Sequence, residues 1–232
     1  MNIRALLRRF LYTQNTLRYR VEWRSIEAAW KRIGKVESLF DGGAGSGEFA
    51  RKALEAEYCN RVTALEFDPG NFAHLKGNLG RDPRATVMQG SVLEVPLPDE
   101  SFDVVQCTQV LEHLVEHERA AAELVRVLKP GGHAIITVPH PPEPYPNDGH
   151  VREGYTESDL SALFTVQGLH PLATDWFLTR ETVDAMLRAD RMPLHGVYLP
   201  VALMDKEAGL TTAQRQQNRP FGILMLFKKP MS

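Results

Sequence analysis

The strongest constraint on the fold of this chain is a regular alternation of two hydrophobic patterns. Short runs rich in β-branched and aromatic residues are separated by segments whose apolar residues recur at helical spacing. Such an alternation is typical of α/β proteins, in which helices cover a mostly parallel sheet. The strand-like runs occupy residues 36–41, 61–67, 85–90, 102–107 and 133–139, and the helical segments occupy 48–58, 68–79, 119–128 and 156–168.

Charge, hydropathy and cysteine content limit the partners and the cellular compartment that we expect for this protein. The chain has 232 residues, of which 24% are charged, and its formal net charge is −2. This charge supplies no global field that would attract nucleic acid, and no apolar run reaches the roughly 18 residues that span a bilayer. The two cysteines, Cys59 and Cys107, stand at no metal-type spacing and suit a reducing compartment. We therefore expect a soluble cytoplasmic protein with no nucleic-acid partner and no membrane-spanning segment.

Residues 1–34 form a basic segment with five arginines before the first acid, Glu22. Their pattern predicts two helices, which we expect to form a cap on the domain that follows. The first helix fits a transit peptide or a peripheral membrane contact, but we favour a helix lying over the domain with its arginines in water. The apolar positions are Ile3, Leu6, Leu7, Phe10 and Leu11 in the first helix and Ile26, Trp30 and Ile33 in the second, which Gly34 ends.

A glycine-rich turn directly follows the first strand of the sheet. Gly43, Gly45 and Gly47 stand in FDGGAGSGEF, between that strand and a helix. Glycines let a ligand approach the backbone closely, and the helix N-terminus offers it unpaired amides. Glu66, at the end of the second strand, is placed to accept hydrogen bonds from ribose hydroxyls. The pattern predicts a nucleotide-type cofactor site, which a nicotinamide dehydrogenase would also use.

Four segments together resemble the class I S-adenosylmethionine-dependent methyltransferases, particularly the group that includes the ubiquinone and menaquinone methyltransferases. They are SLFDGGAGSGEFA, VTALEFDP, GSVLEVPLPDESFDVVQCTQVLEHL and LVRVLKPGGHAIITVP. The resemblance implies a Rossmann-like three-layer sandwich at 35–232, with a seven-stranded, mostly parallel sheet whose reversed last strand is RPFGILMLFKK (219–229). It also implies S-adenosyl-L-methionine as cofactor and S-adenosyl-L-homocysteine as product.

Carried over residue by residue, the resemblance assigns the cofactor site to the ends of neighbouring strands. The glycine turn would surround the methionine part, and Glu66 would bind the ribose diol. Adenine would lie against Ser91, and the backbone at Thr108 and Gln109 would face the methionine amino group. The expected cofactor-binding residues are Asp41, Gly43, Ala44, Gly45, Gly47, Glu66, Phe67, Ser91, Val92, Thr108 and Gln109.

Two positions depart from the family pattern. Ser91 stands where the family has an aspartate that accepts from the adenine amino group, so a weaker hydroxyl acceptor or the next backbone amides would take that role. Gln109, in QVLEH, replaces the first carboxylate of a segment, EVLEH, that is associated with a divalent metal in quinone O-methyltransferases. Because Glu112 and His113 alone make a poor site for a hard metal ion, we expect no metal requirement.

A proline-rich stretch, VPHPPEPYPNDGHVREGYT (138–156), joins the fifth strand to the next helix. Its position at the ligand-binding edge of a parallel sheet favours a wall of the active site over a flexible linker. His140 and His150 are candidate catalytic bases, although each taken alone fits a surface or capping histidine better. Tyr145 and Tyr155 are candidate walls for an acceptor ring, and Arg152 either binds an acidic acceptor or pairs with a neighbouring glutamate.

An insertion is predicted at about 179–215, because the chain there is longer than such a sheet requires. TRETVDAMLRAD (179–190) predicts a helix through Val183, Met186 and Leu187, and an apolar run follows at 194–204. The insertion would cover the acceptor pocket or form a dimer surface, so a monomer and a homodimer both stay open.

The function predicted from these features is methyl transfer from S-adenosylmethionine to a small-molecule acceptor. O-methylation is favoured over C- or N-methylation, because a histidine base suits a hydroxyl acceptor. The alternatives are a non-catalytic binding module with the methyltransferase fold and, less favoured, a nicotinamide-dependent oxidoreductase.

Overall fold

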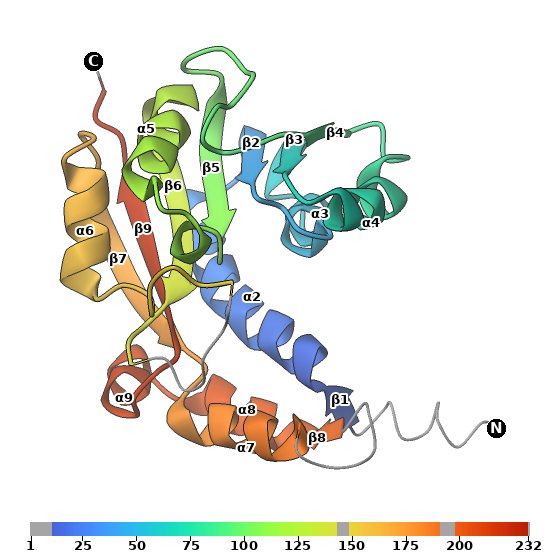
Figure 1. Cartoon of the computed structure of the whole chain (residues 1–232), viewed down its shortest axis with the longest axis vertical. Coiled ribbons are helices and arrows are strands. Elements are labelled where there is room, and N and C mark those ends of the chain that lie inside the picture. The colour runs from blue at the N-terminus through green and yellow to red at the C-terminus, as the bar shows by residue number, and fades with distance from the viewer. Residues whose placement is uncertain (1–10, 143–148, 191–197, 232) are drawn as a thin grey trace.

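The computed structural model describes residues 11–142, 149–190 and 198–231, and its centre is a twisted sheet (Figure 1). Within these residues the sheet has seven strands in the order β4-β3-β2-β5-β6-β9-β7. β9 runs antiparallel to both of its neighbours, and the other pairs are parallel, which confirms the predicted sheet with a reversed last strand. The strands are β2 (Val36–Gly42), β3 (Cys59–Glu66), β4 (Ala85–Gln89), β5 (Phe102–Thr108), β6 (Leu128–Pro139), β7 (His170–Phe177) and β9 (Gly222–Lys228).

Helices cover both faces of the sheet, so the domain has three layers. On one face, Trp30, Leu54 and Leu75 belong to a single core cluster with the strands. On the other face, Leu124 and Phe164 are buried against the strands. The central strands are buried from both sides, and this is why they read as nearly continuous apolar runs. The first face carries α2 (Gln14–Ile33), α3 (Glu48–Glu55) and α4 (Pro69–Leu79), and the second carries α5 (His117–Val127) and α6 (Glu157–Thr165).

Short polar signals set the helix ends. Asp68 caps α4, because its side chain accepts from the backbone N–H of Asn71 at 2.8 Å and Pro69 follows at the first helical position. Thr156 and Asp159 form a capping box at the start of α6. The helix predicted at 48–58 is shorter than expected, since α3 ends at Glu55 and Glu57 turns the chain at φ 58° toward β3.

The N-terminal segment differs from the expected pair of helices. The predicted first helix lies mostly outside the described residues, and its last residue, Leu11, begins a strand instead. That strand, β1 (Leu11–Thr13), pairs antiparallel with β8 (Tyr198–Pro200). The second helix is present as α2, and Gly34 follows it at φ 83° as a glycine C-terminal signal requires. Ile26 and Trp30 are fully buried, so α2 is part of the core rather than a loose cap.

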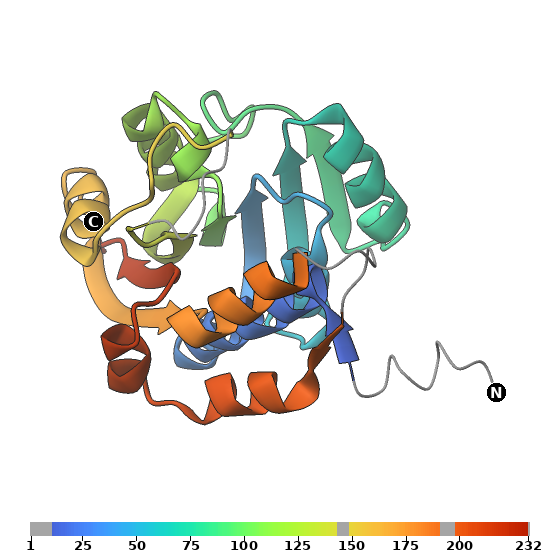
Figure 2. The ribbon, with the colours of Figure 1, turned by 60° about the horizontal axis from the view of Figure 1, so that its bottom comes forward.

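The predicted insertion is helical and lies beside α2 (Figure 2). The helix expected at 179–190 is present as α7 (Arg180–Asp190), and Val183 is buried. Part of the apolar run at 194–204 lies outside the described residues, and the rest forms β8 and the start of α8 (Val201–Gly209). A guanidinium nitrogen of Arg24 donates to the carbonyl of Met204 at 2.9 Å and ties α2 to α8. A short helix, α9 (Thr212–Gln217), then leads into β9.

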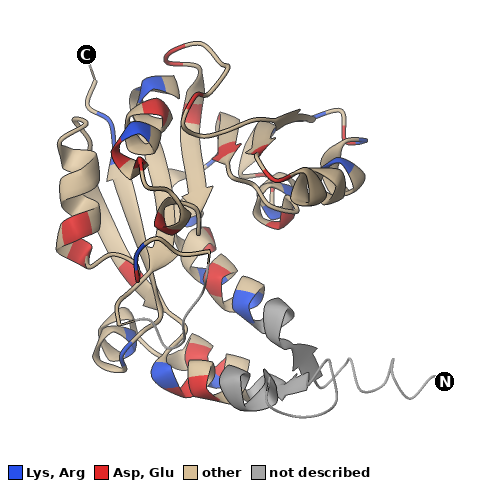
Figure 3. Ribbon diagram, viewed as in Figure 1, with Lys and Arg blue, Asp and Glu red and all other residues tan. Residues whose placement is uncertain are grey.

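Charges of both signs alternate along the helices (Figure 3). Glu27 and Lys31 pair on α2 at 2.9 Å, and Arg180 and Asp184 pair on α7 at 2.8 Å. This interspersed pattern accompanies the net charge of −2. Among the described residues, no helix is long and apolar enough to cross a membrane.

Candidate active site

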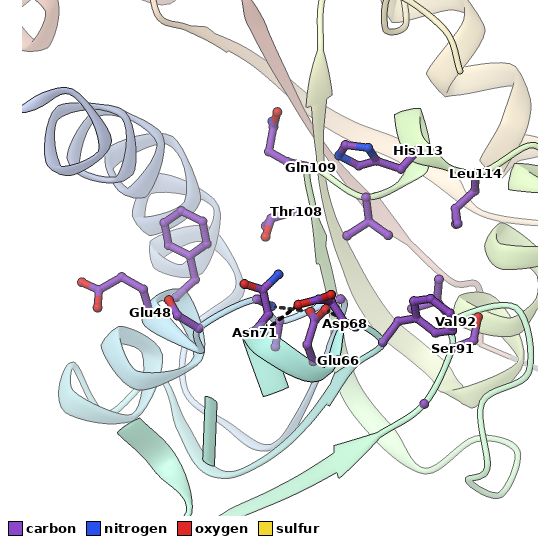
Figure 4. A pocket seen from close by; sticks show the side chains of 18 of the residues that line it. Glu48, Glu66, Asp68, Asn71, Ser91, Val92, Thr108, Gln109, His113 and Leu114 are labelled. Atoms are coloured by element: carbon purple, nitrogen blue, oxygen red, sulfur yellow. Dashed lines mark hydrogen bonds between the residues drawn. The ribbon is translucent and has the colours of Figure 1, made fainter. Parts of the chain in front are cut away.

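A pocket of about 540 Å³ lies at the carboxyl ends of the parallel strands (Figure 4). Its walls come from the turn after β2, the ends of β3 and β5, and the N-terminal half of α2. Parallel sheets bind ligands at this edge, because the strand ends and the following helix N-termini converge there. Nine of the residues expected to bind the cofactor line this pocket: Gly43, Ala44, Gly45, Glu66, Phe67, Ser91, Val92, Thr108 and Gln109.

The glycine turn needs glycine for two different reasons. Gly43 has φ 75°, and a Cβ there would collide with the side chain of Val110. Gly45 has φ 57°, and a Cβ there would point into open space within the pocket. The first glycine therefore allows the turn to approach the segment after β5, and the second leaves the backbone accessible to a ligand.

Glu66 is held at the pocket floor by two backbone amides. Its Oε2 accepts from the N–H of Gly45 and its Oε1 from the N–H of Asp68, each at 2.8 Å. These bonds join the end of β3 to the glycine turn and fix the carboxylate, and each oxygen keeps a lone pair for a ligand hydroxyl. Beside it, Phe67 is 72% exposed and presents an aromatic face to the pocket.

Ser91 and Val92 form the wall after β4. The Ser91 hydroxyl accepts from the backbone N–H of Leu93 at 3.1 Å, and Val92 is buried beneath the pocket. The hydroxyl thus closes a local turn, and its oxygen keeps one further lone pair.

Two of the expected cofactor residues shape the site without lining it. Asp41 is 1% exposed and accepts from Gln106 Nε2 at 3.3 Å. Burial raises the pKa of Asp41 to about 7, and the nearby Glu66 charge adds to the effect. Gly47, at φ 79°, precedes α3, and a Cβ there would collide with Leu75 and Leu79.

The far end of the pocket is built by α2 and the segment after β5. The backbone N–H of Gln109 donates to the carbonyl of Thr137 at 2.9 Å and holds Gln109 at φ 54°. Figure 4 shows Gln109 and His113 together at this end, on the opposite side from Glu66. Sequence reasoning missed five of the lining residues there: Arg18, Tyr19 and Glu22 of α2, Phe49 of α3 and His113.

Comparison with known proteins finds matches to the segment that carries most of the residues lining this pocket. Residues 40–136 match the family model of the methyltransferase domain. This segment is similar to the methyltransferase domain of known proteins. A probable S-adenosylmethionine-dependent methyltransferase of Mycolicibacterium smegmatis is 39% identical over 97 residues, which cover 42% of this chain and 37% of that protein. A demethylmenaquinone methyltransferase of Clavibacter sepedonicus is 34% identical over 120 residues, which cover 51% of this chain and 46% of that protein.

The fold comparison agrees with the sequence matches. An S-adenosylmethionine-dependent methyltransferase structure from Mesorhizobium loti superposes with a TM-score of 0.64 at 18% identity, over 90% of this chain and 97% of that chain. The resemblance stated from the sequence is thereby confirmed. The matched segments span less than half of the length of the two relatives named above.

The described part of the proline-rich stretch lies beside the pocket rather than in its lining. His140 is half-buried, and its backbone N–H donates to the carbonyl of Phe221 at 2.5 Å. His150 lies closer, with its ring centroid 4.7 Å from that of the pocket residue His113. A nitrogen of His113, Nδ1, also lies 2.7 Å from the carbonyl oxygen of Gly149. Tyr145 lies outside the described residues.

The environment keeps His150 neutral. Burial, together with the neighbouring His113 and Arg18, lowers its pKa to about 4. Burial also lowers the pKa of His140. Both imidazoles are therefore uncharged near neutral pH, the form in which a histidine accepts a proton.

Tyr155 and Arg152 contact the segment after β5 beside the pocket. The Tyr155 hydroxyl donates to the carbonyl of Leu111 at 3.2 Å, receives a bond from Arg152 at 2.6 Å, and lies 2.9 Å from His117 Nδ1. Burial raises the pKa of Tyr155 to about 12. The structure places neither residue among those lining the pocket, because both turn toward the short helix η1 (Leu111–His113).

Three side chains at the pocket edge bring potential metal ligands together. Ligand atoms of Glu112, His113 and His150 all lie within 4.8 Å of one another. The expectation of no metal rested on Glu112 and His113 alone, and the fold adds His150 to them. One carboxylate and two imidazoles form a nitrogen-rich set, which suits Mg²⁺ poorly because that ion prefers oxygen ligands.

Proposed function

We propose that this protein transfers a methyl group from S-adenosylmethionine to a small-molecule acceptor, with oxygen as the favoured atom. One observation carries the proposal: a single pocket joins the glycine turn, the fixed carboxylate of Glu66 and the strand end at Thr108 and Gln109. Small-molecule specificity and a cytoplasmic location belong to the same proposal.

The pocket offers a place for each part of the cofactor. Glu66 would accept from the ribose diol, since both of its oxygens are oriented by backbone amides and keep free lone pairs. Phe67 would lie against the adenine ring, and the Ser91 hydroxyl would accept weakly from its amino group. The backbone at Gly45 and Thr108 would surround the methionine part, because a ligand can approach the chain closely at Gly45.

The acceptor would enter at the far end of the pocket, where α2 meets Gln109 and His113. The bound sulfonium supplies an activated methyl group, so the protein has mainly to align the acceptor and exclude water. Tyr19 and Phe49 line this end and pack edge to face at 5.6 Å between ring centroids. Aromatic walls of this kind suit a planar acceptor.

The residues of the proline-rich stretch receive revised roles in this proposal. His150 would be a positioning residue that holds His113 at the pocket wall, since its ring packs against His113. Arg152 and Tyr155 would stabilise η1 through their hydrogen bonds to the Leu111 carbonyl. A direct proton-accepting role for His140 is less favoured, because His140 does not line the pocket.

The proposal is tested first by calorimetric titration with S-adenosylmethionine, S-adenosylhomocysteine and NADH. We expect micromolar binding of the two adenosyl ligands and none of NADH; the reverse preference would support the oxidoreductase alternative. Binding of S-adenosylmethionine without methylation of any acceptor would support the non-catalytic binding module. Failure of both adenosyl ligands would refute the proposal.

A matched pair of variants tests the role of Glu66. Glu66→Gln keeps the shape of the side chain but removes its charge, and we expect affinity for S-adenosylhomocysteine to fall by about 10- to 100-fold, as loss of a charge-assisted hydrogen bond implies. Glu55→Gln is the control, because Glu55 lies at the exposed end of α3. Equal affinities in the two variants would contradict the assignment.

A further inference from the structure

Glu22 is a buried acid in the middle of α2. The residue is 0% exposed, although it lies among the residues that line the pocket. Its neighbours on the same helix face, Ile26 and Trp30, are apolar and fully buried. A carboxylate in such a position costs free energy unless its charge is compensated or used. The side chain therefore needs an explanation other than packing.

The contacts of Glu22 satisfy only one of its two oxygens. Oε1 accepts from the Thr137 hydroxyl at 2.6 Å and from Gln109 Nε2 at 3.3 Å. Oε2 has no hydrogen-bond donor in the part of the chain that the structure describes, and its nearest cation is Arg18, whose Nε lies 4.0 Å away. Burial raises the pKa of Glu22, and the charge of Arg18 opposes that effect. One carboxylate oxygen is thus left at the acceptor end of the pocket.

Glu207 is a second buried glutamate, and the chain satisfies both of its oxygens. Both of its oxygens accept from the backbone N–H of Thr179, and Oε2 also accepts from the hydroxyls of Thr179 and Thr182 at 2.6 Å. The contrast with Glu22 indicates that the open oxygen at the pocket is a feature of the site.

The geometry points to a catalytic role for Glu22 within the proposed methyl transfer. We propose that its carboxylate receives the proton of a phenolic O–H acceptor bound between α2 and Gln109. Gln109 and Thr137 fix one oxygen, and the other has no donor in the described part of the chain although Glu22 is among the residues that line the pocket. The aromatic walls at Tyr19 and Phe49 suit the ring of such an acceptor.

The step balances without a further reactant. The acceptor oxygen forms a bond to the methyl carbon as the carbon–sulfur bond of the sulfonium breaks. The O–H proton passes to Glu22, which leaves a methyl ether, a neutral thioether and a protonated carboxyl group. The proton then returns to water after the products depart. An acceptor that is already ionised needs no such base, and this difference provides the test.

The experiment compares Glu22→Gln with Glu27→Gln, the same substitution five residues further along α2. Glu27 lies outside the pocket and pairs with Lys31 at the surface. The probes are phenol, whose pKa is about 10, and phenols acidified by electron-withdrawing groups until they are ionised at the assay pH. Titration with S-adenosylhomocysteine and thermal unfolding accompany each variant, so that loss of cofactor binding or of folding is seen separately.

We expect Glu22→Gln to lose about 10²- to 10⁴-fold in kcat/KM for phenol and less than about 10-fold for the ionised phenols, with cofactor affinity preserved. Glu27→Gln should match the unchanged protein for both. Equal losses for all phenols, no loss, or a protein that binds cofactor but methylates no phenol would each overturn the role of Glu22. If Glu22→Gln does not fold, Glu22→Asp keeps the charge and should retain more activity toward phenol than Glu22→Ala. Failure of the unchanged protein to bind S-adenosylhomocysteine would instead overturn the proposed function.

Discussion

Alanine substitutions at Gly43 and Gly45 should separate stability from cofactor binding. Both glycines have positive φ, at 75° and 57°, so both substitutions carry a left-handed backbone cost of about 1–2 kcal/mol. A reduction of unfolded-state entropy offsets roughly 0.4–1 kcal/mol of that cost in each case. These contributions are nearly the same at the two positions and cancel in the comparison.

The two variants differ in the atoms that surround the added methyl group. At Gly43 it collides with Val110, and overpacking of this kind costs about 1–3 kcal/mol. At Gly45, which lines the pocket, it meets no atom within 4 Å. Gly43→Ala should therefore be less stable than Gly45→Ala by about 1–3 kcal/mol. Gly45→Ala should instead weaken S-adenosylhomocysteine binding by at least about tenfold.

Urea unfolding measures the first difference and calorimetric titration the second. The double variant Gly43→Ala, Val110→Ala should be less destabilised than the sum of its single variants, because removal of two methyl groups restores the space; coupling of about 0.5–3 kcal/mol is expected for residues in contact. Equal stabilities of the two glycine variants, or strict additivity in the double variant, would refute the reasoning.

Three further outcomes follow from side chains around the pocket. Tyr155→Phe should lower the free energy of unfolding by about 1–3 kcal/mol, since it leaves buried partners of the hydroxyl unsatisfied; unchanged urea midpoints would contradict this. The pKa of His150 is about 4 in the folded state and about 6.5 in the unfolded state. Between these two pH values the unfolded state binds more protons, so the free energy of unfolding should fall as the pH drops through this window. His150→Gln should flatten that dependence in pH-jump unfolding. Activity should survive chelation, because the carboxylate and two imidazoles of Glu112, His113 and His150 suit magnesium poorly; a loss of activity that magnesium restores would overturn this expectation.

The fold was predictable because its main signals are local. The apolar strands β2, β3, β5 and β6 are central and buried, so their composition alone marks them. The edge strand β7 was missed, because its first residues are exposed and its sequence, HPLATDWF, begins with polar and turn-forming residues. β1 and β8 were missed for another reason: each has three residues, and they are strands only because they meet each other across the chain.

The position of the pocket at the glycine turn and Glu66 was predictable for the same reason as the fold, and their role in cofactor binding stays a prediction. The glycine turn and Glu66 lie at strand ends that the sequence marks, and a single hydrogen bond from Gly45 joins them. Tyr155 shows the limit of this reasoning, since its place in a polar loop suggested a pocket wall. Its hydroxyl is instead directed inward by the Leu111 carbonyl and Arg152, which no local pattern reveals.

The end of the pocket proposed to hold the acceptor, where α2 meets Gln109 and His113, depends on packing between distant segments. Glu22 reaches Thr137 across 115 positions of the sequence, and His150 reaches His113 only after the chain has turned back from β6. A signal for Glu22 was nevertheless present, because an acid stood on the helix face that carries Ile26 and Trp30.

The two ends of the pocket also differ in how far residue roles can be inferred from similar proteins. The family match covers residues 40–136 and so includes the glycine turn, Glu66 and Gln109. Arg18, Glu22 and the stretch that carries His150 lie outside it, and these segments surround the acceptor end of the pocket. The residues that would bind the cofactor are therefore those for which relatives provide a precedent. Those that would select the acceptor belong to segments outside that match, so acceptor specificity should follow variation at Glu22 and Tyr19 more closely than variation in the glycine turn.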